Sequence, residues 1–378
     1  MLSKARAALG AAVLGACLAA SPAAHAAAPA IHAHRGGTVL NGKPTYAEET
    51  LDAYRSAATN GFVFEVDAKL TSDGIPVAIH DATLDRTTTC TGEVRSFTRA
   101  ALRGCRPDVL GSPGGGLPTR TITPRGSIPT IAEVLELARL TGSKVNLEIK
   151  NLPTDPDYDP TSAYANRVMD VVAASGLPRA QLLIQSFIPA NLDAAKRRLP
   201  RVPTSLLTIP AGPAEIAVAL DKGYTWLSPQ WPIAIDFVRE AHRHRKLVAP
   251  YTINERADAR AAARLGVDAL ITDDPLMVAG ALGLRPVKGL TAKFTRHGAF
   301  VEATGRLLVP RRTLCTGAVT LRVLAGKRVL RARPARLAGD CTYATAVPVP
   351  RGARLRATVG FGGNERLLPR LIGPRQLR

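Results

Sequence analysis

Acidic and basic side chains gather between His34 and Asp81, each at the end of a short apolar run. Glu65 and Asp67 follow one such run, and because residues i and i+2 of a strand share a face, their carboxylates point together. Glu148 ends another apolar run further along the chain. Hard oxygen ligands of this kind suit Ca²⁺ or Mg²⁺, so we expect one divalent cation on Glu65, Asp67 and Glu148. Carboxylates at strand ends also form structural ion pairs with Arg, so the neighbouring groups decide between the two interpretations.

Two histidines and two cations supply those neighbouring groups. His34 and His80 are candidates for acid and base, because an unperturbed imidazole titrates near neutral pH. Arg35 offers a planar fork that suits a phosphate, and Lys150 follows Glu148 on the same strand face and adds a point charge. Together these groups indicate an anionic substrate. A phosphodiester fits, with one imidazole deprotonating a nucleophile and the other protonating the leaving alkoxide.

The elements that must position these residues alternate between short apolar runs and amphipathic stretches from residue 31 to about residue 283. This alternation predicts parallel β/α units. The candidate strands number nine, one more than a (β/α)8 barrel needs, so one run must be a loop or an extra pairing. They span residues 31–33, 62–66, 77–79, 145–149, 182–184, 205–207, 224–227, 247–249 and 269–271.

Helices are expected between these runs, and the first has the clearest start signal. Thr130 and Glu133 form a capping box ahead of an apolar helical pattern that stops at Gly142. Further helical patterns span residues 161–175, 189–199, 214–222, 235–245, 257–265 and 275–282. Residues 82–127 fit neither the helical nor the strand period. We expect them to form a disulfide-pinned insertion that covers the mouth of the site.

The motifs in this region resemble those of the glycerophosphodiester phosphodiesterases, the GDPD-type enzymes, over about residues 30–283. Each motif is weak alone, and their order along the chain makes the resemblance specific. They are His34-Arg35-Gly36, Ala47-Glu48-Glu49-Thr50, Phe64-Glu65-Val66-Asp67, Asp73 to Val77 with His80-Asp81, Leu84-Asp85-Arg86-Thr87, Glu148-Ile149-Lys150, Gln185-Ser186-Phe187, Tyr251-Thr252-Ile253-Asn254 and Gly266 to Pro275.

The resemblance implies a TIM (β/α)8 barrel with its site at the carboxyl ends of the strands. It also implies the metal on the three carboxylates, His34 and His80 as the acid/base pair, and phosphate contacts from Arg35 and Lys150. A glycerol hydroxyl would attack the phosphorus to give a cyclic phosphate, which water opens to glycerol 3-phosphate and a free alcohol. Glu48 is expected to hold Arg35 or a ligand in place.

The chain departs from the family pattern at two positions. Glu49 stands where the family usually has Asn, which places an extra carboxylate next to Glu48. Tyr251 stands where Trp is frequent, near the substrate pocket. Both changes leave the catalytic groups in place and put the preferred alcohol portion of the substrate in doubt.

The N-terminus has the pattern of a secretion signal in residues 1–26. Lys4 and Arg6 precede an apolar stretch, and Ala24-His25-Ala26 is a small-x-small cleavage site. Cys17 also lies in a sequence like a lipoprotein box, so a lipid-anchored protein is the alternative to a secreted one. After removal of the signal, no other segment has the pattern of a transmembrane helix.

Four cysteines follow the signal, an even number that suits export to an oxidising compartment. Local pairing is the simplest arrangement, joining Cys90 to Cys105 and Cys315 to Cys341. No Cys-x-x-Cys occurs, so the spacing does not suggest zinc.

Positive charge is concentrated in residues 285–378, where short alternating runs predict a small antiparallel β module. This segment holds 20 Lys and Arg against three acidic residues, or +17, which leaves +3 of the total of +20 for the rest. Its field would favour an anionic cell-wall polymer or lipid surface. An Arg-rich solvated surface without a partner is the alternative. Nucleic acid is not expected, because aromatic residues for base stacking are sparse.

Three functions are therefore compared. The first is a secreted, metal-dependent glycerophosphodiesterase, whose substrate is a glycerophosphodiester. The second is a phospholipase or teichoic-acid-degrading phosphodiesterase of the same superfamily. The third is an inactive wall- or lipid-binding protein, which the complete set of His and carboxylate residues argues against.

Overall fold

Eight parallel strands form the centre of the protein in a computed structural model that describes residues 28–112, 126–326 and 328–377. Neighbouring strands follow the order β10-β9-β8-β7-β6-β4-β1-β11. The strands are β1 (Ala30–Ala33), β4 (Val63–Leu70), β6 (Val145–Ile149), β7 (Leu182–Ser186), β8 (Thr204–Thr208), β9 (Trp226–Pro229), β10 (Leu247–Val248) and β11 (Ala269–Thr272).

Backbone hydrogen bonds join the two ends of this sheet. The N–H of Asp268 donates to the carbonyl of Val248 at 2.9 Å, and the N–H of Ile271 donates to Pro250 at 3.0 Å. The strands therefore close into the predicted (β/α)8 barrel. The ninth candidate run is β5 (Pro76–Ala78), which pairs antiparallel with β4 outside the ring.

A helix follows each barrel strand, as the sequence pattern predicts. Thr50 caps the first of them, and Thr130 and Glu133 form the expected capping box on the second. The helices are α1 (Leu51–Asn60), α2 (Ile131–Thr141), α3 (Ala163–Ala174), α4 (Pro189–Arg198), α5 (Pro213–Asp221), α6 (Ile235–Arg243), α7 (Arg256–Leu265) and α8 (Pro275–Ala281), with a 3-10 turn η4 (Arg179–Gln181) before β7.

Alternation along the barrel strands separates the core from the site. On β4, Phe64 and Val66 belong to the main apolar core, which contains residues from the surrounding helices. Glu65 and Asp67 have the opposite parity, so they face the interior of the barrel. One strand thus anchors the helices with one face and presents carboxylates with the other.

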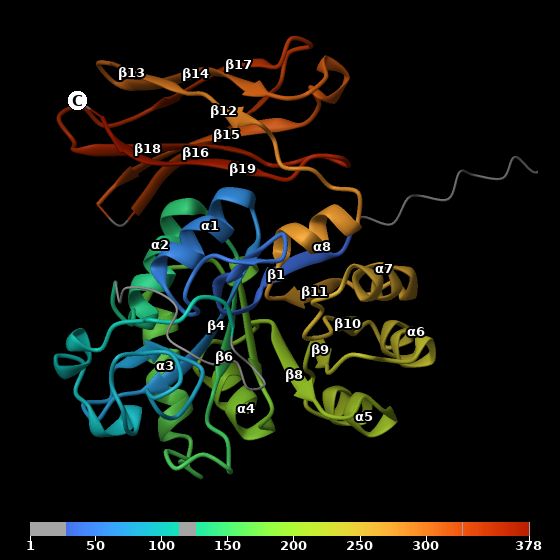
Figure 1. Ribbon diagram of the computed structural model, residues 1–378. Coiled ribbons are helices and arrows are strands. Elements are labelled where there is room, and N and C mark those ends of the chain that lie inside the picture. The colour runs from blue at the N-terminus through green and yellow to red at the C-terminus, as the bar shows by residue number, and fades with distance from the viewer. Residues whose placement is uncertain (1–27, 113–125, 327, 378) are drawn as a thin grey trace, which may run out of the picture.

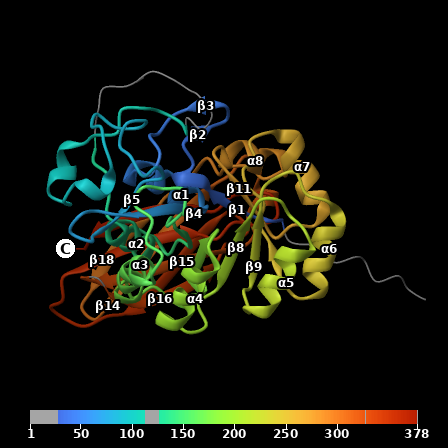
Figure 2. The same cartoon turned by 90° about the horizontal axis from the view of Figure 1, so that it is seen from below.

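The insertion at residues 82–127 is pinned by the predicted disulfide between Cys90 and Cys105. It contains η2 (Val94–Ser96) and η3 (Ala101–Gly104) and has a small apolar cluster of its own around Leu84. At its far end Gly111 bridges to Ala47, close to the hairpin of β2 (Val39–Leu40) and β3 (Lys43–Pro44). Figure 2 shows the insertion and this hairpin at the same side of the barrel. Residues 113–125, which the prediction also included, lie outside the described residues.

The C-terminal region forms the predicted antiparallel module, as two sheets packed face to face (Figure 1). Alternating side chains from both sheets build a second apolar core. One sheet contains β12 (Gly289–Leu290), β13 (Lys293–His297), β14 (Phe300–Leu308) and β17 (Thr342–Pro348); the other contains β15 (Ala318–Ala325), β16 (Arg328–Arg336), β18 (Leu355–Phe361) and β19 (Arg370–Gln376), and η5 (Arg312–Leu314) precedes β15.

This module covers the end of the barrel where the strands begin. Its sheet of β15, β16, β18 and β19 lies beside α1 and α2 (Figure 1). Arg322 of β15 donates to the carbonyl of Thr141, at the end of α2, at 3.0 Å. The basic module therefore lies at the opposite end of the barrel from the carboxyl ends of the strands.

The second disulfide, between Cys315 and Cys341, closes a loop of 26 residues within the module. A cross-link of this length is expected to stabilise the folded state by about 3.5 kcal/mol, mainly by restricting the unfolded chain. We predict that replacing both cysteines with Ser lowers the free energy of unfolding of the module by this amount. Denaturant titration of the two proteins checks this, and an unchanged midpoint would contradict it.

Within the described residues, no helix is long and apolar enough to cross a bilayer. Residues 1–27 lie outside the described part of the chain, so the predicted signal peptide and Cys17 remain sequence-based predictions.

Candidate active site

A cavity of about 500 Å³ opens at the carboxyl ends of the barrel strands. Its lining comes from strands β4, β6, β7, β8 and β11 and from the loops after β1, β5, β6, β7 and β10. Seven of the nine predicted site residues line it: His34, Arg35, Glu65, His80, Glu148, Lys150 and Tyr251. The other two are close by, because Asp67 contacts Arg35 and Lys150, and Glu48 contacts Arg35.

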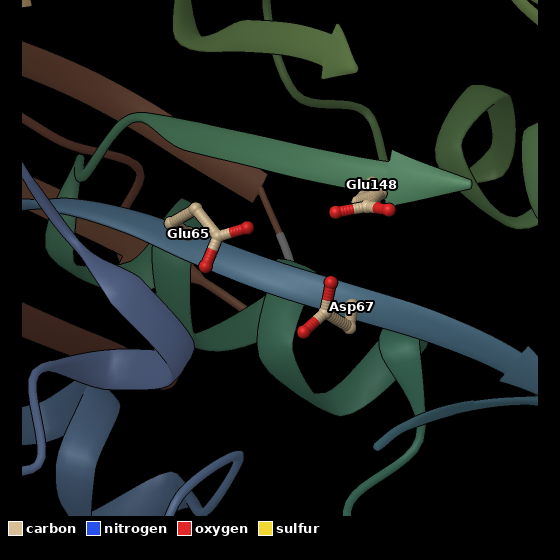
Figure 3. Close-up of side chains that lie close together, drawn as sticks. All are labelled: Glu65, Asp67 and Glu148. Atoms are coloured by element: carbon tan, nitrogen blue, oxygen red, sulfur yellow. The ribbon is translucent and has the colours of Figure 1, made fainter. Parts of the chain in front are cut away.

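The three carboxylates lie over two neighbouring strands, as Figure 3 shows. Asp67 of β4 is paired in register with Glu148 of β6, and Glu65 lies two residues earlier on β4. One ligand oxygen from each lies within 4.8 Å of the others, and all three residues are buried. Both oxygens of Asp67 and Oε1 of Glu148 are buried and accept no hydrogen bond, although Arg35 and Lys150 form ion pairs with them at 3.2 to 3.7 Å. Three buried carboxylates that still have oxygens free of hydrogen bonds are costly, so these residues fit a divalent cation with oxygen ligands.

The charge state of the triad follows from burial and crowding. Burial raises the pKa of Glu65 to about 7, and the Asp67 charge adds to this rise. Burial raises the pKa of Glu148 to about 8, although Lys150 opposes the change. For Asp67, burial is outweighed by Lys150, His80 and Arg35, and its pKa is lowered. Crowded acids that resist ionisation without a counter-charge are typical of a site that collects a cation.

His34 is held by a carboxylate that comes near the end of the barrel domain in the sequence. Its Nδ1 lies 2.6 Å from Oδ1 of Asp273, directly after β11, and Asn254 donates to the other Asp273 oxygen at 2.7 Å. Burial lowers the pKa of His34, and Arg35 opposes protonation too, but Asp273 and Glu65 together outweigh both and the net shift is upward. Because Nδ1 is engaged, Nε2 is the nitrogen left for proton transfer.

His80 is held in the same way by its neighbour in the chain. Its Nδ1 lies 2.5 Å from Oδ1 of Asp81, whose Oδ2 accepts from Nε of Arg86 at 2.5 Å. Burial lowers the pKa of His80, and Lys150 lowers it further against the opposing effect of Asp67. The two imidazoles are thus shifted in opposite directions, as an acid/base pair requires.

Arg86 links Asp81, the partner of His80, to Glu48, the partner of Arg35. Its guanidinium also donates to both oxygens of Glu48, at 2.7 and 3.1 Å. Glu48 in turn accepts from Nη1 of Arg35 at 3.2 Å. Glu48 therefore holds Arg35 through direct contact, which is the positioning role that the sequence suggested for it.

Backbone geometry explains the His-Arg-Gly sequence. Arg35 has a φ of 52°, in the left-handed region that non-glycine residues rarely adopt. This turn aims its N–H at Oε2 of Glu65, 2.9 Å away. The next residue, Gly36, has a φ of 94°, and a Cβ there would lie 2.6 Å from Cβ of Ala53. Only glycine lets η1 (His34–Gly36) pack this closely against α1.

Lys150 lies between two of the carboxylates. Its Nζ is 3.2 Å from Oε1 of Glu148 and 3.6 Å from Oδ1 of Asp67. Burial lowers its pKa, but these two acids outweigh burial and the net shift is upward, so the ammonium stays charged. Lys150 and Arg35 thus provide two fixed positive charges beside the acidic triad.

Glu49 does not join the Glu48 network, although the two residues are adjacent. Its Oε1 accepts from the backbone N–H of Asp67 at 3.1 Å, and its Oε2 accepts from the hydroxyl of Tyr54. Burial raises the pKa of Glu49 well above its ordinary value, and Asp67 and Glu65 raise it further. The carboxyl group in place of the family's Asn therefore binds the backbone of β4 and does not line the cavity.

This raised pKa predicts a pH effect on stability. The folded protein keeps a proton on Glu49 that the unfolded chain releases above about pH 4.5, so the contribution of Glu49 to stability is lost as pH rises. Glu49→Gln keeps a neutral side chain at every pH. We expect the variant to be as stable as wild type near pH 4 and more stable than wild type at pH 8, by about 1.4 kcal/mol for each unit by which folding raises the pKa of Glu49. Denaturant titrations with chelator at both pH values check this, and a constant difference would contradict it.

The cavity wall also includes two aromatic side chains. Phe187 and Tyr251 meet edge to face, with ring centroids 6.1 Å apart and an interplanar angle of 87°. Gln185 also lines the cavity and donates to Oε1 of Glu65 at 2.8 Å. Asn146 donates to Gln185 at 2.7 Å, which fixes the orientation of that amide.

Sequence reasoning assigned no role to Asp273, Asp81, Arg86 or Gln185, although all four lie within the quoted motifs. Asp81 could have been found, because a carboxylate next to a histidine is a common partner for it. Asp273 lies 239 residues from His34, and only the closure of the barrel brings them together.

The fold and this arrangement define a barrel enzyme whose site is built for an anionic substrate. A family model described as the glycerophosphoryl diester phosphodiesterase family matches residues 34–277. The chain belongs to this family, as its motifs predicted, and is an enzyme that hydrolyses glycerophosphodiesters.

Individual proteins agree with this assignment. The chain is 28% identical to a glycerophosphodiester phosphodiesterase of Bacillus altitudinis, over 65% of this chain and 94% of the relative. It is 40% identical to human glycerophosphodiester phosphodiesterase 1 over 104 residues, 27% of this chain and 28% of the relative.

Solved structures share the barrel. A crystal structure named as a glycerophosphoryl diester phosphodiesterase from Silicibacter pomeroyi is 25% identical, covers 68% of this chain and 94% of its own, and has a TM-score of 0.57. An Oleispira antarctica phosphodiesterase, solved in complex with the product sn-glycerol-3-phosphate, is 23% identical, with a TM-score of 0.55, and covers 68% and 97% of the two chains. The second likeness supports the fold.

Proposed function

We propose that this protein hydrolyses glycerophosphodiesters to glycerol 3-phosphate and a free alcohol, using a divalent cation and the pair His34 and His80. The observation that carries this proposal is the shared cavity, which both imidazoles, Arg35 and Lys150 line beside the acidic triad. Family membership supplies the substrate class.

Glu65, Asp67 and Glu148 would hold the cation, which would polarise a phosphoryl oxygen and offset the charge that develops on it. Ca²⁺ and Mg²⁺ both suit three carboxylates, so either ion can serve. Arg35 and Lys150 neutralise the remaining phosphate charge at fixed positions.

The histidines move the protons. One imidazole takes the proton of the glycerol hydroxyl next to the phosphate, and that oxygen attacks phosphorus to form a cyclic phosphate. The other imidazole gives a proton to the leaving alkoxide, so the alcohol departs neutral. Water then opens the ring with the two roles reversed. Asp273 and Asp81 stabilise each imidazolium and fix its orientation.

A substrate panel tests this proposal against its alternatives. Release of glycerol 3-phosphate from glycerophosphocholine or glycerophosphoethanolamine supports the glycerophosphodiesterase. Cleavage restricted to lysophospholipid or teichoic acid, or a cyclic final product, would favour the related phospholipase or wall-degrading enzyme. No turnover of any of them with Ca²⁺ or Mg²⁺ would favour a binding protein.

We propose further that the protein is exported, with residues 1–26 removed. Two disulfides among the described residues suit an oxidising compartment. N-terminal sequencing of protein recovered from the medium should begin at Ala27. A lipidated N-terminal Cys17 would instead show the anchored alternative.

The basic module is proposed to attach the enzyme to an anionic cell-wall polymer or lipid surface. Four arginines of β16, Arg328, Arg331, Arg333 and Arg336, are exposed on an outer strand of the module. Attachment through this end leaves the catalytic cavity open at the other. Changing all four to Gln should weaken low-salt binding to isolated cell wall or anionic vesicles without altering turnover of a soluble substrate; equal binding would disprove attachment through β16.

A further inference from the structure

We propose that Asp155 makes the alcohol end of the cavity selective for a cationic alcohol group, such as choline or ethanolamine, an inference that rests on the proposed hydrolysis of glycerophosphodiesters. Asp155 lies in the loop after β6 and lines the same cavity as the two histidines. Its side chain is 22% exposed, so it can contact a bound molecule.

The charge of Asp155 is only half compensated by its surroundings. Nζ of Lys69 lies 2.5 Å from Oδ2 of Asp155 and 2.9 Å from Oδ1 of Asp157. Lys69 is fully buried, and its single ammonium is shared by these two carboxylates. Within the described residues, no other Lys or Arg forms an ion pair with either acid. The cluster therefore carries a net charge of −1, of which Asp155 is the part that reaches the cavity.

The wall of the cavity thus carries charge of both signs. Arg35 and Lys150 provide fixed positive charge for the phosphate. Asp155 adds negative charge to the same wall, and Phe187 and Tyr251 add aromatic rings. An ammonium group is attracted both to a carboxylate and to an aromatic ring. A glycerophosphodiester with an ammonium on its alcohol would match this pattern, and a diester with a neutral alcohol would leave Asp155 without a partner.

The test compares kcat/KM of the full chain, with divalent cation, on glycerophosphocholine, glycerophosphoethanolamine and the neutral-headed glycerophosphoglycerol. We expect wild type to prefer the two cationic substrates, and the preference to shrink as salt is raised. Asp155→Asn should lower kcat/KM by about fivefold on the cationic substrates and by less than about twofold on the neutral one, the size of one partly exposed charge pair. Asp155→Glu should retain the preference.

Asp157→Asn is the matched control, because it removes the same charge beside Lys69 from a residue that does not line the cavity. We expect it to change the preference less than Asp155→Asn does. An equal loss on all three substrates in Asp155→Asn would show a purely structural role and overturn the inference. Wild type that cleaves all three equally would also overturn it while leaving the proposed function intact. Wild type that cleaves none of them would refute the proposed function itself.

Discussion

Replacing His80 with Ala is expected to lower kcat on glycerophosphocholine by about 100- to 10,000-fold, the range that a general acid or base contributes. The side chain lies in the cavity, with Nδ1 fixed by Asp81 and Nε2 left for proton transfer. His34→Ala should have an effect of similar size, because one histidine cannot fill both roles. Cation binding, measured by calorimetry, should persist in both variants, since neither imidazole belongs to the acidic triad.

The matched control is His297→Ala, on the exposed surface of the C-terminal module. It should leave kcat unchanged. Full activity in His80→Ala would refute the acid/base assignment. Loss of cation binding together with activity would instead show that the substitution disturbs the metal ligands.

Asp67→Asn should weaken binding of the divalent cation by about 10- to 100-fold, since even residues that only orient a ligand have effects of this size. Asp67 is the member of the triad that stays ionised, and both of its oxygens are buried without a hydrogen-bond partner. We expect activity to fall with affinity and to recover in part at high cation concentration. Calorimetric titration with Ca²⁺ and Mg²⁺ measures the affinity directly.

Asp52→Asn is the matched control for this change, because Asp52 is a solvent-exposed carboxylate on α1. It should bind the cation as wild type does. Unchanged affinity in Asp67→Asn would contradict the assignment of the cation to this triad.

Much of the barrel could be predicted from the sequence, because apolar runs and helical periods alternate along the chain. The surplus ninth run could not be placed, since an antiparallel strand such as β5, buried throughout, has the same apolar pattern as a barrel strand. The limits of the pattern appear again in residues 82–127, where a local disulfide and a small apolar cluster replace regular periodicity.

The strand-end carboxylates and histidines could also be predicted, because side-chain parity and position at strand ends are local properties. Contacts that depend on the closed ring could not. Asp273 meets His34 only because β11 lies beside β1. The hydrogen bond from the backbone of Asp67 to Glu49 depends on packing in three dimensions, and so does the ion pair between Lys69 and Asp155. Neither contact leaves a periodic signal in the sequence.

Release of glycerol 3-phosphate from glycerophosphocholine, followed before and after removal of divalent cations with a chelator, tests the central claim most directly. The claim is that the buried triad holds a cation needed for turnover by the two histidines. We predict release by the untreated protein, loss of release with chelator, and recovery when Ca²⁺ or Mg²⁺ is added in excess. Release that continues unchanged after complete removal of divalent cations would contradict it.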